Sequence, residues 1–132
     1  MRTPLCERLG CTHPILQAGM GGVARSELVT AVCKAGGYGF LGMVRESPEL
    51  IRSEIRAVRA ATDRPFGVNL IPAATDPGLF DEELSACLDE DIHSLCFFWN
   101  VDETAVQRAK QAGKFVFHQV GSVESAVAAA DA

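Results

Sequence analysis

A chain of 132 residues, 48% hydrophobic and 22% charged, has the composition of one globular domain with a sizeable core. Its net charge of −5 gives no basic surface for nucleic acid or anionic lipid, and no apolar run reaches the roughly 18 to 20 residues of a membrane span. The amino terminus lacks the apolar core of a signal peptide, so we expect a cytoplasmic protein without nucleic-acid or membrane partners.

Five short apolar strands, each followed by an amphipathic helix, are predicted along the chain. The strands are expected at residues 14–18, 38–42, 66–70, 94–98 and 115–120. Near-continuous apolar runs are typical of strands buried on both faces, so the alternation predicts an α/β fold with a parallel sheet covered by helices. No linker or composition shift divides residues 1–132, which favours a single domain.

The first strand leads into a glycine-rich loop. Gly19, Gly21 and Gly22 allow the backbone to approach a flat or anionic ligand closely and to adopt positive φ where the turn requires it. The next helix, with Ser26 as its cap, is expected to aim free N–H groups in the same direction. The alternative is an ordinary strand-to-helix turn, since the full Gly-x-Gly-x-x-Gly spacing is absent.

Opposite faces of the helix that begins after Ser47 differ in character. Its apolar stripe consists of Ile51, Ile55 and Val58, and its other side carries Arg52, Arg56 and Arg59. We interpret these arginines as a solvated helix face rather than a phosphate-binding patch.

Three acidic residues, Asp81, Glu82 and Glu83, fall in the first turns of a helix predicted over residues 78–89. The helix dipole favours negative charge there, so we interpret them as structural rather than catalytic. The same helix is expected to bury Phe80, Leu84, Cys87 and Leu88.

An odd number of cysteines without a Cys-x-x-Cys pair predicts reduced thiols rather than disulfides or a zinc site. They are Cys6, Cys11, Cys33, Cys87 and Cys96. The last three fall on apolar helix faces or within a strand, which favours small core residues over nucleophiles. No metal site is expected.

Four segments together resemble the nitronate monooxygenase family, also called 2-nitropropane dioxygenases. They are residues 14–23 (Pro-Ile-Leu-Gln-Ala-Gly-Met-Gly-Gly-Val), 27–29 with 35–39, 63–70 (Asp-Arg-Pro-Phe-Gly-Val-Asn-Leu) and 117–126. The resemblance covers nearly the whole chain in the family's order. It implies an FMN-dependent (β/α)8 TIM barrel that oxidatively denitrifies alkyl nitronates with dioxygen.

A TIM barrel has eight strand–helix units and typically about 250 residues, whereas five units are predicted here. The resemblance therefore implies five consecutive units of the barrel, truncated before the sixth strand. The family's general-base histidine is expected beyond Ala132, so no catalytic residue is assigned and the isolated chain is expected to be inactive. Open strand edges are expected to promote self-association.

The resemblance also implies the flavin contacts. They are Ala18, Gly19, Met20, Gly21, Asn69 and Gln119. Side-chain amides offer both a donor and an acceptor to the pyrimidine edge of a flavin, and both amides here end strands, where barrel active sites are built. The family often has Ala-Pro-Met where this chain has Ala-Gly-Met. An alternative for Asn69 is a strand-end amide that satisfies the loop backbone.

Side chains alternate across a strand, so His118 and Gln119 should point to opposite faces. If Gln119 meets the flavin, His118 lies toward the helices as a packed or hydrogen-bonded residue. Phe98 and Trp99, at the end of the fourth strand, either line a substrate pocket or pack at its rim.

Two alternatives stay open. A flavin-dependent enoyl reductase-type barrel, which uses reduced nicotinamide, shares much of the early barrel. A non-enzymatic doubly wound domain of flavodoxin or receiver type also has five strand–helix units. That domain predicts helices on both sheet faces and a first strand inside the sheet, whereas a barrel piece keeps sequential strand order and every helix on one side.

Overall fold

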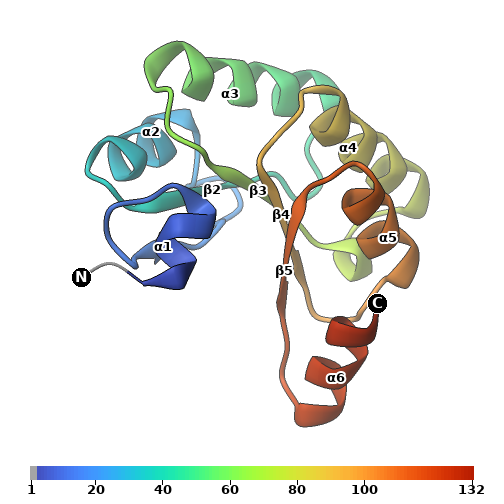
Figure 1. Cartoon of the computed structure of the whole chain (residues 1–132). Helices are drawn as coiled ribbons and strands as arrows, with labels where there is room; N and C mark the ends of the chain where they lie inside the picture. Colours follow the sequence, from blue (N-terminus) through green and yellow to red (C-terminus); the bar gives the residue numbers. More distant parts are fainter. Residues whose placement is uncertain (1–2) are drawn as a thin grey trace.

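The computed structural model describes residues 3–132 as a curved parallel sheet with helices along its outer side (Figure 1). The strands are β1 (Leu16–Gln17), β2 (Tyr38–Gly42), β3 (Gly67–Leu70), β4 (Ser94–Phe98) and β5 (Phe115–Gln119). The helices are α1 (Pro4–Leu9), α2 (Ser26–Lys34), α3 (Pro48–Ala61), α4 (Pro77–Asp89), α5 (Glu103–Gln111) and α6 (Val123–Asp131), with a short 3-10 helix η1 (Pro72–Ala74). Within these residues, none of the helices combines the length and the apolar character of a membrane-spanning segment.

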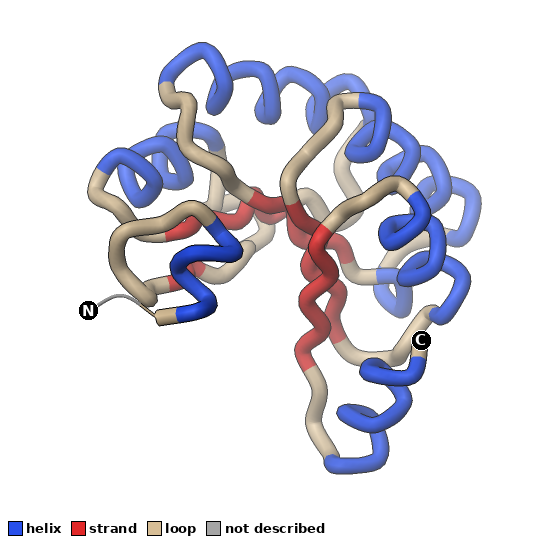
Figure 2. The backbone as a smooth tube through the Cα atoms, in the orientation of Figure 1, coloured by secondary structure: helices blue, strands red, loops and turns tan. Residues whose placement is uncertain are grey.

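Strand order decides between the two predicted fold types. All strand pairs are parallel and the order is β1-β2-β3-β4-β5, with β1 at an edge. A doubly wound sheet would hold its first strand in the interior. The five units therefore form a half-barrel, as predicted, and the flavodoxin or receiver alternative is wrong (Figure 2).

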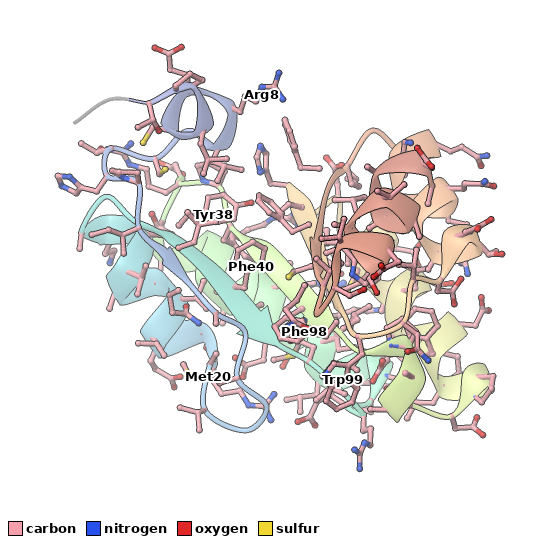
Figure 3. All side chains as sticks on the ribbon, turned by 90° about the horizontal axis from the view of Figure 1, so that it is seen from below. Arg8, Met20, Tyr38, Phe40, Phe98 and Trp99 are labelled. Carbon is pink, nitrogen blue, oxygen red and sulfur yellow. The ribbon has the colours of Figure 1, made fainter. Side chains whose placement is uncertain are left out.

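Helix α1 was not predicted, although its end signals are present in the sequence. The Thr3 side chain accepts a hydrogen bond from the N–H of Cys6, Pro4 occupies the first turn, and Gly10 ends the helix at φ 66°. Six residues are too few for a clear helical periodicity. The helix lies at the end of the sheet that Tyr38 occupies, so it covers the amino ends of the strands (Figure 3).

The main core lies between the outer face of the sheet and α2 to α5. Fully buried members include Leu41, Met43, Val68, Leu70, Leu95, Phe97, Ile51, Ile55, Val58 and Leu84. Each such side chain contributes about 1.5–3 kcal/mol relative to exposure. Cys33 and Cys87 belong to this core as predicted, whereas Cys96 is partly exposed on the inner face.

A second, aromatic cluster lines the inner face of the sheet. Phe40 packs edge-on against Tyr38 and Phe117, with ring centroids 5.2 and 5.3 Å apart. The hydroxyl of Tyr38 lies 2.8 Å from Nδ1 of His93 and 2.6 Å from Oγ of Ser94. This network satisfies the buried hydroxyl and fixes β2 against β4.

The α3 arginines face outward as predicted, but they are not free in solvent. Arg52 pairs with Asp89 at 2.9 Å, and Arg56 and Arg59 pair with Glu90 at 2.6 and 3.6 Å. The acidic end of α4 thus balances the basic face of α3, and these pairs join the two helices.

Candidate cofactor site

The candidate site lies at the carboxyl ends of the strands, where the loop between β1 and α2 crosses the sheet. Met20, Phe98 and Trp99 lie at this end, opposite the end occupied by α1 and Tyr38 (Figure 3). The carbonyl of Met20 accepts hydrogen bonds from the N–H groups of Val23 (3.1 Å) and Ala24 (2.8 Å). The loop therefore holds its own shape.

The loop packs directly on the backbone of the sheet. A Cβ at Gly42 would lie 2.4 Å from the carbonyl carbon of Met20, and a Cβ at Gly19 would lie 2.3 Å from Cβ of Asn69. Neither approach is possible with a larger residue. Gly42 was not among the predicted site residues, and its only sequence signal is a glycine at a strand end.

Beneath the loop lies a cavity of about 270 Å³. It is lined by Leu16, Gln17, Ala18, Gly19, Phe40, Cys96, Phe98, Phe117, His118 and Gln119. The volume is just below the range of about 300–1,000 Å³ that is usual for small-molecule pockets, so it suits a planar ring rather than a whole nucleotide. Burial raises the pKa of Cys96 to about 11, which keeps its thiol neutral.

Two larger hollows lie away from this end. One, of about 610 Å³, lies between β5, α5 and α6, and the other, of about 480 Å³, includes His93, Lys114 and Arg64 near the amino ends of the strands. Ligand sites in parallel barrels lie at the carboxyl ends of the strands, so we place the candidate site in the smaller cavity.

The structure brings together most of the predicted flavin contacts. Ala18, Gly19 and Gln119 line the cavity. Met20 and Gly21 lie in the loop beside it, and Met20 is 41% exposed. These five residues come from two strand ends that are about a hundred positions apart in the chain. They lie together because the carboxyl ends of parallel barrel strands meet at one edge.

Asn69 behaves differently from the other predicted contacts. It is 2% exposed, lies beneath Gly19 and does not line the cavity. Its Nδ2 donates to the carbonyl oxygens of Cys96 (2.9 Å) and Leu70 (3.4 Å). In this arrangement the amide satisfies strand-end backbone, and its contact with a flavin stays a prediction.

His118 and Gln119 point to opposite faces of β5. Both residues border the cavity, but the His118 ring centroid lies 6.4 Å from that of Phe97 in the outer core, and His118 also lines the hollow between β5, α5 and α6. The Nδ1 atom of His118 is 3.1 Å from the carbonyl oxygen of Gln119, and its Nε2 is buried with no hydrogen-bond partner in residues 3–132. The prediction that His118 turns toward the helices is confirmed.

Phe98 and Trp99 occupy the two positions that were considered for them, in the pocket lining and at its rim. Phe98 lines the cavity, while Trp99 is 57% exposed at the rim. The backbone of Trp99 is left-handed, with φ 69°, which is unfavourable for a residue other than glycine. Trp99 directly follows the last residue of β4.

The amino terminus of α2 differs from the prediction. Ser26 is the first residue of the helix rather than its cap, and Arg25 at the cap position makes no side-chain capping bond. The N–H of Ser26 donates to Oε2 of Glu54 on α3 at 2.6 Å. A carboxylate from the neighbouring helix therefore occupies part of this positive helix end, so the expectation of free N–H groups aimed at a ligand was wrong for Ser26.

The comparisons with known proteins agree with this geometry. A family model described as nitronate monooxygenase matches residues 2–80. Over 126 residues the chain is 35% identical to the (3aS,4S,5R,7aS)-5-hydroxy-7a-methyl-1-oxo-octahydro-1H-indene-4-carboxyl-CoA dehydrogenase of Mycobacterium tuberculosis, which corresponds to 96% of this chain and 35% of that protein. Over 80 residues it is 42% identical to a nitronate monooxygenase of Paraburkholderia phytofirmans, covering 58% of this chain and 22% of that protein.

Two solved structures share the fold. FabK from Thermotoga maritima superimposes with a TM-score of 0.92 at 30% identity, over 99% of this chain and 41% of that one. A nitroalkane oxidase from Streptomyces ansochromogenes gives a TM-score of 0.84 at 28% identity, over 96% of this chain and 45% of that one. The chain thus spans about a third or less of the length of the two curated relatives and under half of these structures.

Proposed function

Because this chain belongs to the nitronate monooxygenase family, we propose that it forms the cofactor-binding wall of an FMN-dependent oxidoreductase that oxidises alkyl nitronates with dioxygen. One observation carries the proposal. The cavity at the carboxyl ends of the strands has aromatic walls from Phe40, Phe98 and Phe117, with the Gly19 backbone and the Gln119 amide at its border.

These residues fit a flavin ring. The cavity is mainly apolar, and no side chain with a permanent charge is among its lining residues. Gln119 would offer its amide to the pyrimidine edge, and the loop at Gly19 would bring backbone groups close to the ring. A bound FMN supplies the electron acceptor for substrate oxidation. The chain's own contribution is to orient the ring and to exclude water from one of its faces.

Substrate protonation sharpens the proposal. A nitronate has already lost the α-proton of its nitroalkane, so its oxidation needs no general base, whereas a neutral nitroalkane must first be deprotonated. His118 is the one histidine among the residues that line the cavity, and its imidazole is turned toward Phe97. We therefore expect the site to respond to a nitronate and not to the parent nitroalkane, and we expect no sustained turnover by this chain alone.

Equilibrium dialysis with FMN tests the cofactor assignment. We expect saturable binding that is weak enough to be lost on gel filtration, because the cavity covers only part of the cofactor. Replacing Gln119 by Leu should weaken binding about tenfold, which is the size of one lost hydrogen bond. The control Gln111→Leu, an exposed amide at the end of α5, should bind as the wild type does. Absence of saturable binding, or equal affinity in both variants, would overturn the assignment.

Ligand-induced changes in the absorbance of bound FMN test the substrate. Propyl-2-nitronate should perturb the flavin spectrum and raise FMN affinity, and 2-nitropropane should not. A perturbation by NAD(P)H instead would favour the enoyl reductase alternative. An enoyl reductase domain from Bacillus amyloliquefaciens shares only the fold with this chain, at 16% identity.

The length of the alignment favours a second candidate, a dehydrogenase acting on a coenzyme A thioester. The match to the indene-carboxyl-CoA dehydrogenase covers 96% of this chain, whereas the matches to two nitronate monooxygenases cover 58% and 52%. A flavin spectral change with a cyclic acyl-CoA, and none with a nitronate, would replace the first candidate by the second.

We also propose that the chain self-associates through β5. This strand pairs with β4 alone in the described residues, and Phe115, Val123 and Val127 beside the open edge are 39%, 76% and 55% exposed. Unpaired strand edges and exposed apolar surface favour association. Sedimentation velocity should show mass rising with concentration. A single monomer boundary at all concentrations, with cooperative unfolding, would contradict this.

A further inference from the structure

Glu83 is a fully buried carboxyl that lies outside the cavity. The sequence suggested an acidic first turn, but α4 begins at Pro77 and Glu83 stands in the middle of the helix with 0% exposure. Its Oε1 accepts a hydrogen bond from the backbone N–H of Glu46 at 3.0 Å. Its Oε2 is buried with no hydrogen-bond partner in residues 3–132. A buried carboxyl that is half-satisfied is costly to keep, so its position calls for a reason.

The segment that Glu83 contacts is the tight turn that follows β2. Arg45 in this turn has a left-handed backbone, with φ 57°, which is unfavourable outside glycine. The side chain of Glu46 forms an ion pair with Arg25, and Nη1 of Arg25 lies 3.6 Å from Sδ of Met43. The turn is therefore held from two sides, by α4 and by the start of α2.

This turn supports the glycine loop. A Cβ at Gly21 would lie 3.2 Å from Cγ1 of Val44, so that side chain is in close contact with the loop. The N–H of Gly42 donates to the carbonyl of Ala24 at 2.9 Å, and the backbone of Met20 packs on Gly42. Residues 42–46 thus pack against residues 19–24 and support them from the side of the sheet.

We propose that Glu83 is a positioning residue for the cofactor site: its carboxyl holds the turn at residues 43–46, and this turn holds the glycine loop in place. The proposal rests on the proposed function, because the loop matters as a cofactor contact. Glu83 itself touches neither the cavity nor a ligand.

The electrostatics of Glu83 make the connection measurable. Burial raises its pKa to about 7, and the nearby Glu46 carboxylate adds to this rise. On its own helix, the neighbouring Cys87 has a pKa raised by burial and remains neutral. Arg25 pairs with Glu46, and Arg52, which lies near Cys87, pairs with Asp89. The backbone N–H groups of Arg45 and Glu46 favour the ionised form, but burial outweighs them. The buried position of Glu83 is therefore less stable once the carboxyl is ionised, so the hold on the loop should weaken as the pH rises through 7.

The titration of backbone amides tests the proposal without any ligand. In the wild-type chain, the amides of residues 20–23 should shift with the same midpoint, near pH 7, as the carboxyl carbon of Glu83. In Glu83→Gln the loop transition should disappear. In the matched control Glu82→Gln, the exposed neighbour on the same helix, it should remain. Loop amides that do not follow the Glu83 midpoint in the wild type would overturn the proposal, even if Glu83→Gln fails to fold.

FMN affinity between pH 6 and pH 8 links the two proposals. Relative to Glu83→Gln, the affinity of the wild type and of Glu82→Gln should fall about fivefold over this range, which is the lower range of measured site-to-site coupling. Titration of the FMN phosphate is common to all three proteins and cancels in the comparison. If the wild type binds no FMN at any pH, the proposed function fails, while the amide titration still decides the role of Glu83.

Discussion

The central layer of the half-barrel and its C-terminal unit share one sequence pattern but differ in burial. All four residues of β3 are buried, and α3 buries Ile51, Ile55 and Val58 completely. In contrast, no residue of β5 or α6 is buried. β3 has a paired strand on each side, whereas β5 pairs with β4 alone in the described residues. An amphipathic pattern is therefore enough to form a strand or helix, but burial requires neighbours on both sides.

Truncating one apolar side chain in each region should give the largest contrast. Ile55→Ala should lower the free energy of unfolding by about 2–5 kcal/mol, because it leaves a cavity in the main core. Val127→Ala, in α6, should change it by no more than about 0.5 kcal/mol, because that side chain is 55% exposed. Urea unfolding measures both. Equal losses would show that α6 is packed in solution and would break the comparison.

Substitution of one glycine in each region should show the same difference in backbone packing. Gly42→Ala should cost about 1–3 kcal/mol, since its Cβ would meet the backbone of Met20 at 2.4 Å and displace the loop. FMN affinity should fall with it. Gly121→Ala, just after β5, meets no atom within 4 Å and should leave both quantities unchanged. A neutral Gly42→Ala would mean that the loop does not rest on β2.

Two glutamates should give stability changes of opposite sign with pH. The pKa of Glu83 is raised to about 7 in the fold, so its contribution to stability is present below its unfolded pKa and is lost as the pH rises through about 7, by on the order of 1–3 kcal/mol. In α6, hydrogen bonds from its own backbone and from Ser122 lower the pKa of Glu124, so its contribution is lost as the pH falls. Stability–pH curves of Glu83→Gln and Glu124→Gln against the wild type measure these trends. Parallel curves would contradict the assignment.

Surface charges should contribute least to the difference between the regions. Arg52→Gln removes the pair with Asp89, and Lys110→Gln removes a 3.2 Å bond to the carbonyl of Ala132 at the end of α6. Both contacts are partly exposed, so each loss should stay below about 1 kcal/mol and shrink further in high salt. A large loss for Arg52→Gln alone would mean that ion pairs, rather than apolar burial, set the central layer apart.

Local patterns predicted most of the fold. The bounds of β2 and β4 agree with the prediction, and two glycines, Gly36 and Gly37, mark the start of β2. β1 is shorter than expected, since only Leu16 and Gln17 find partners on β2. The flavin-contact loop and Gln119 could be placed together because strand ends of a parallel barrel meet at one edge.

Long-range contacts explain what the sequence did not predict at the site. The carboxylate of Glu54 reaches the amide of Ser26 across 28 positions, and Glu83 reaches Glu46 across 37. The close packing of Gly42 on Met20 also joins two separate loops. No periodicity or end signal encodes such pairs, because they depend on how neighbouring units dock. Within its own segment, none of these residues carries a local sequence signal for the contact.

The exposed rim residue Trp99 has a practical consequence. It is the single tryptophan of the chain, and it stands beside Phe98 where β4 opens onto the cavity. Indole emission from this protein therefore originates at one place, and the other ultraviolet emitter is the single tyrosine, Tyr38. An isoalloxazine absorbs in the wavelength range where indole emits, so cofactor binding should quench the fluorescence of Trp99 by energy transfer. The native chain therefore carries an intrinsic fluorescent probe of its cavity.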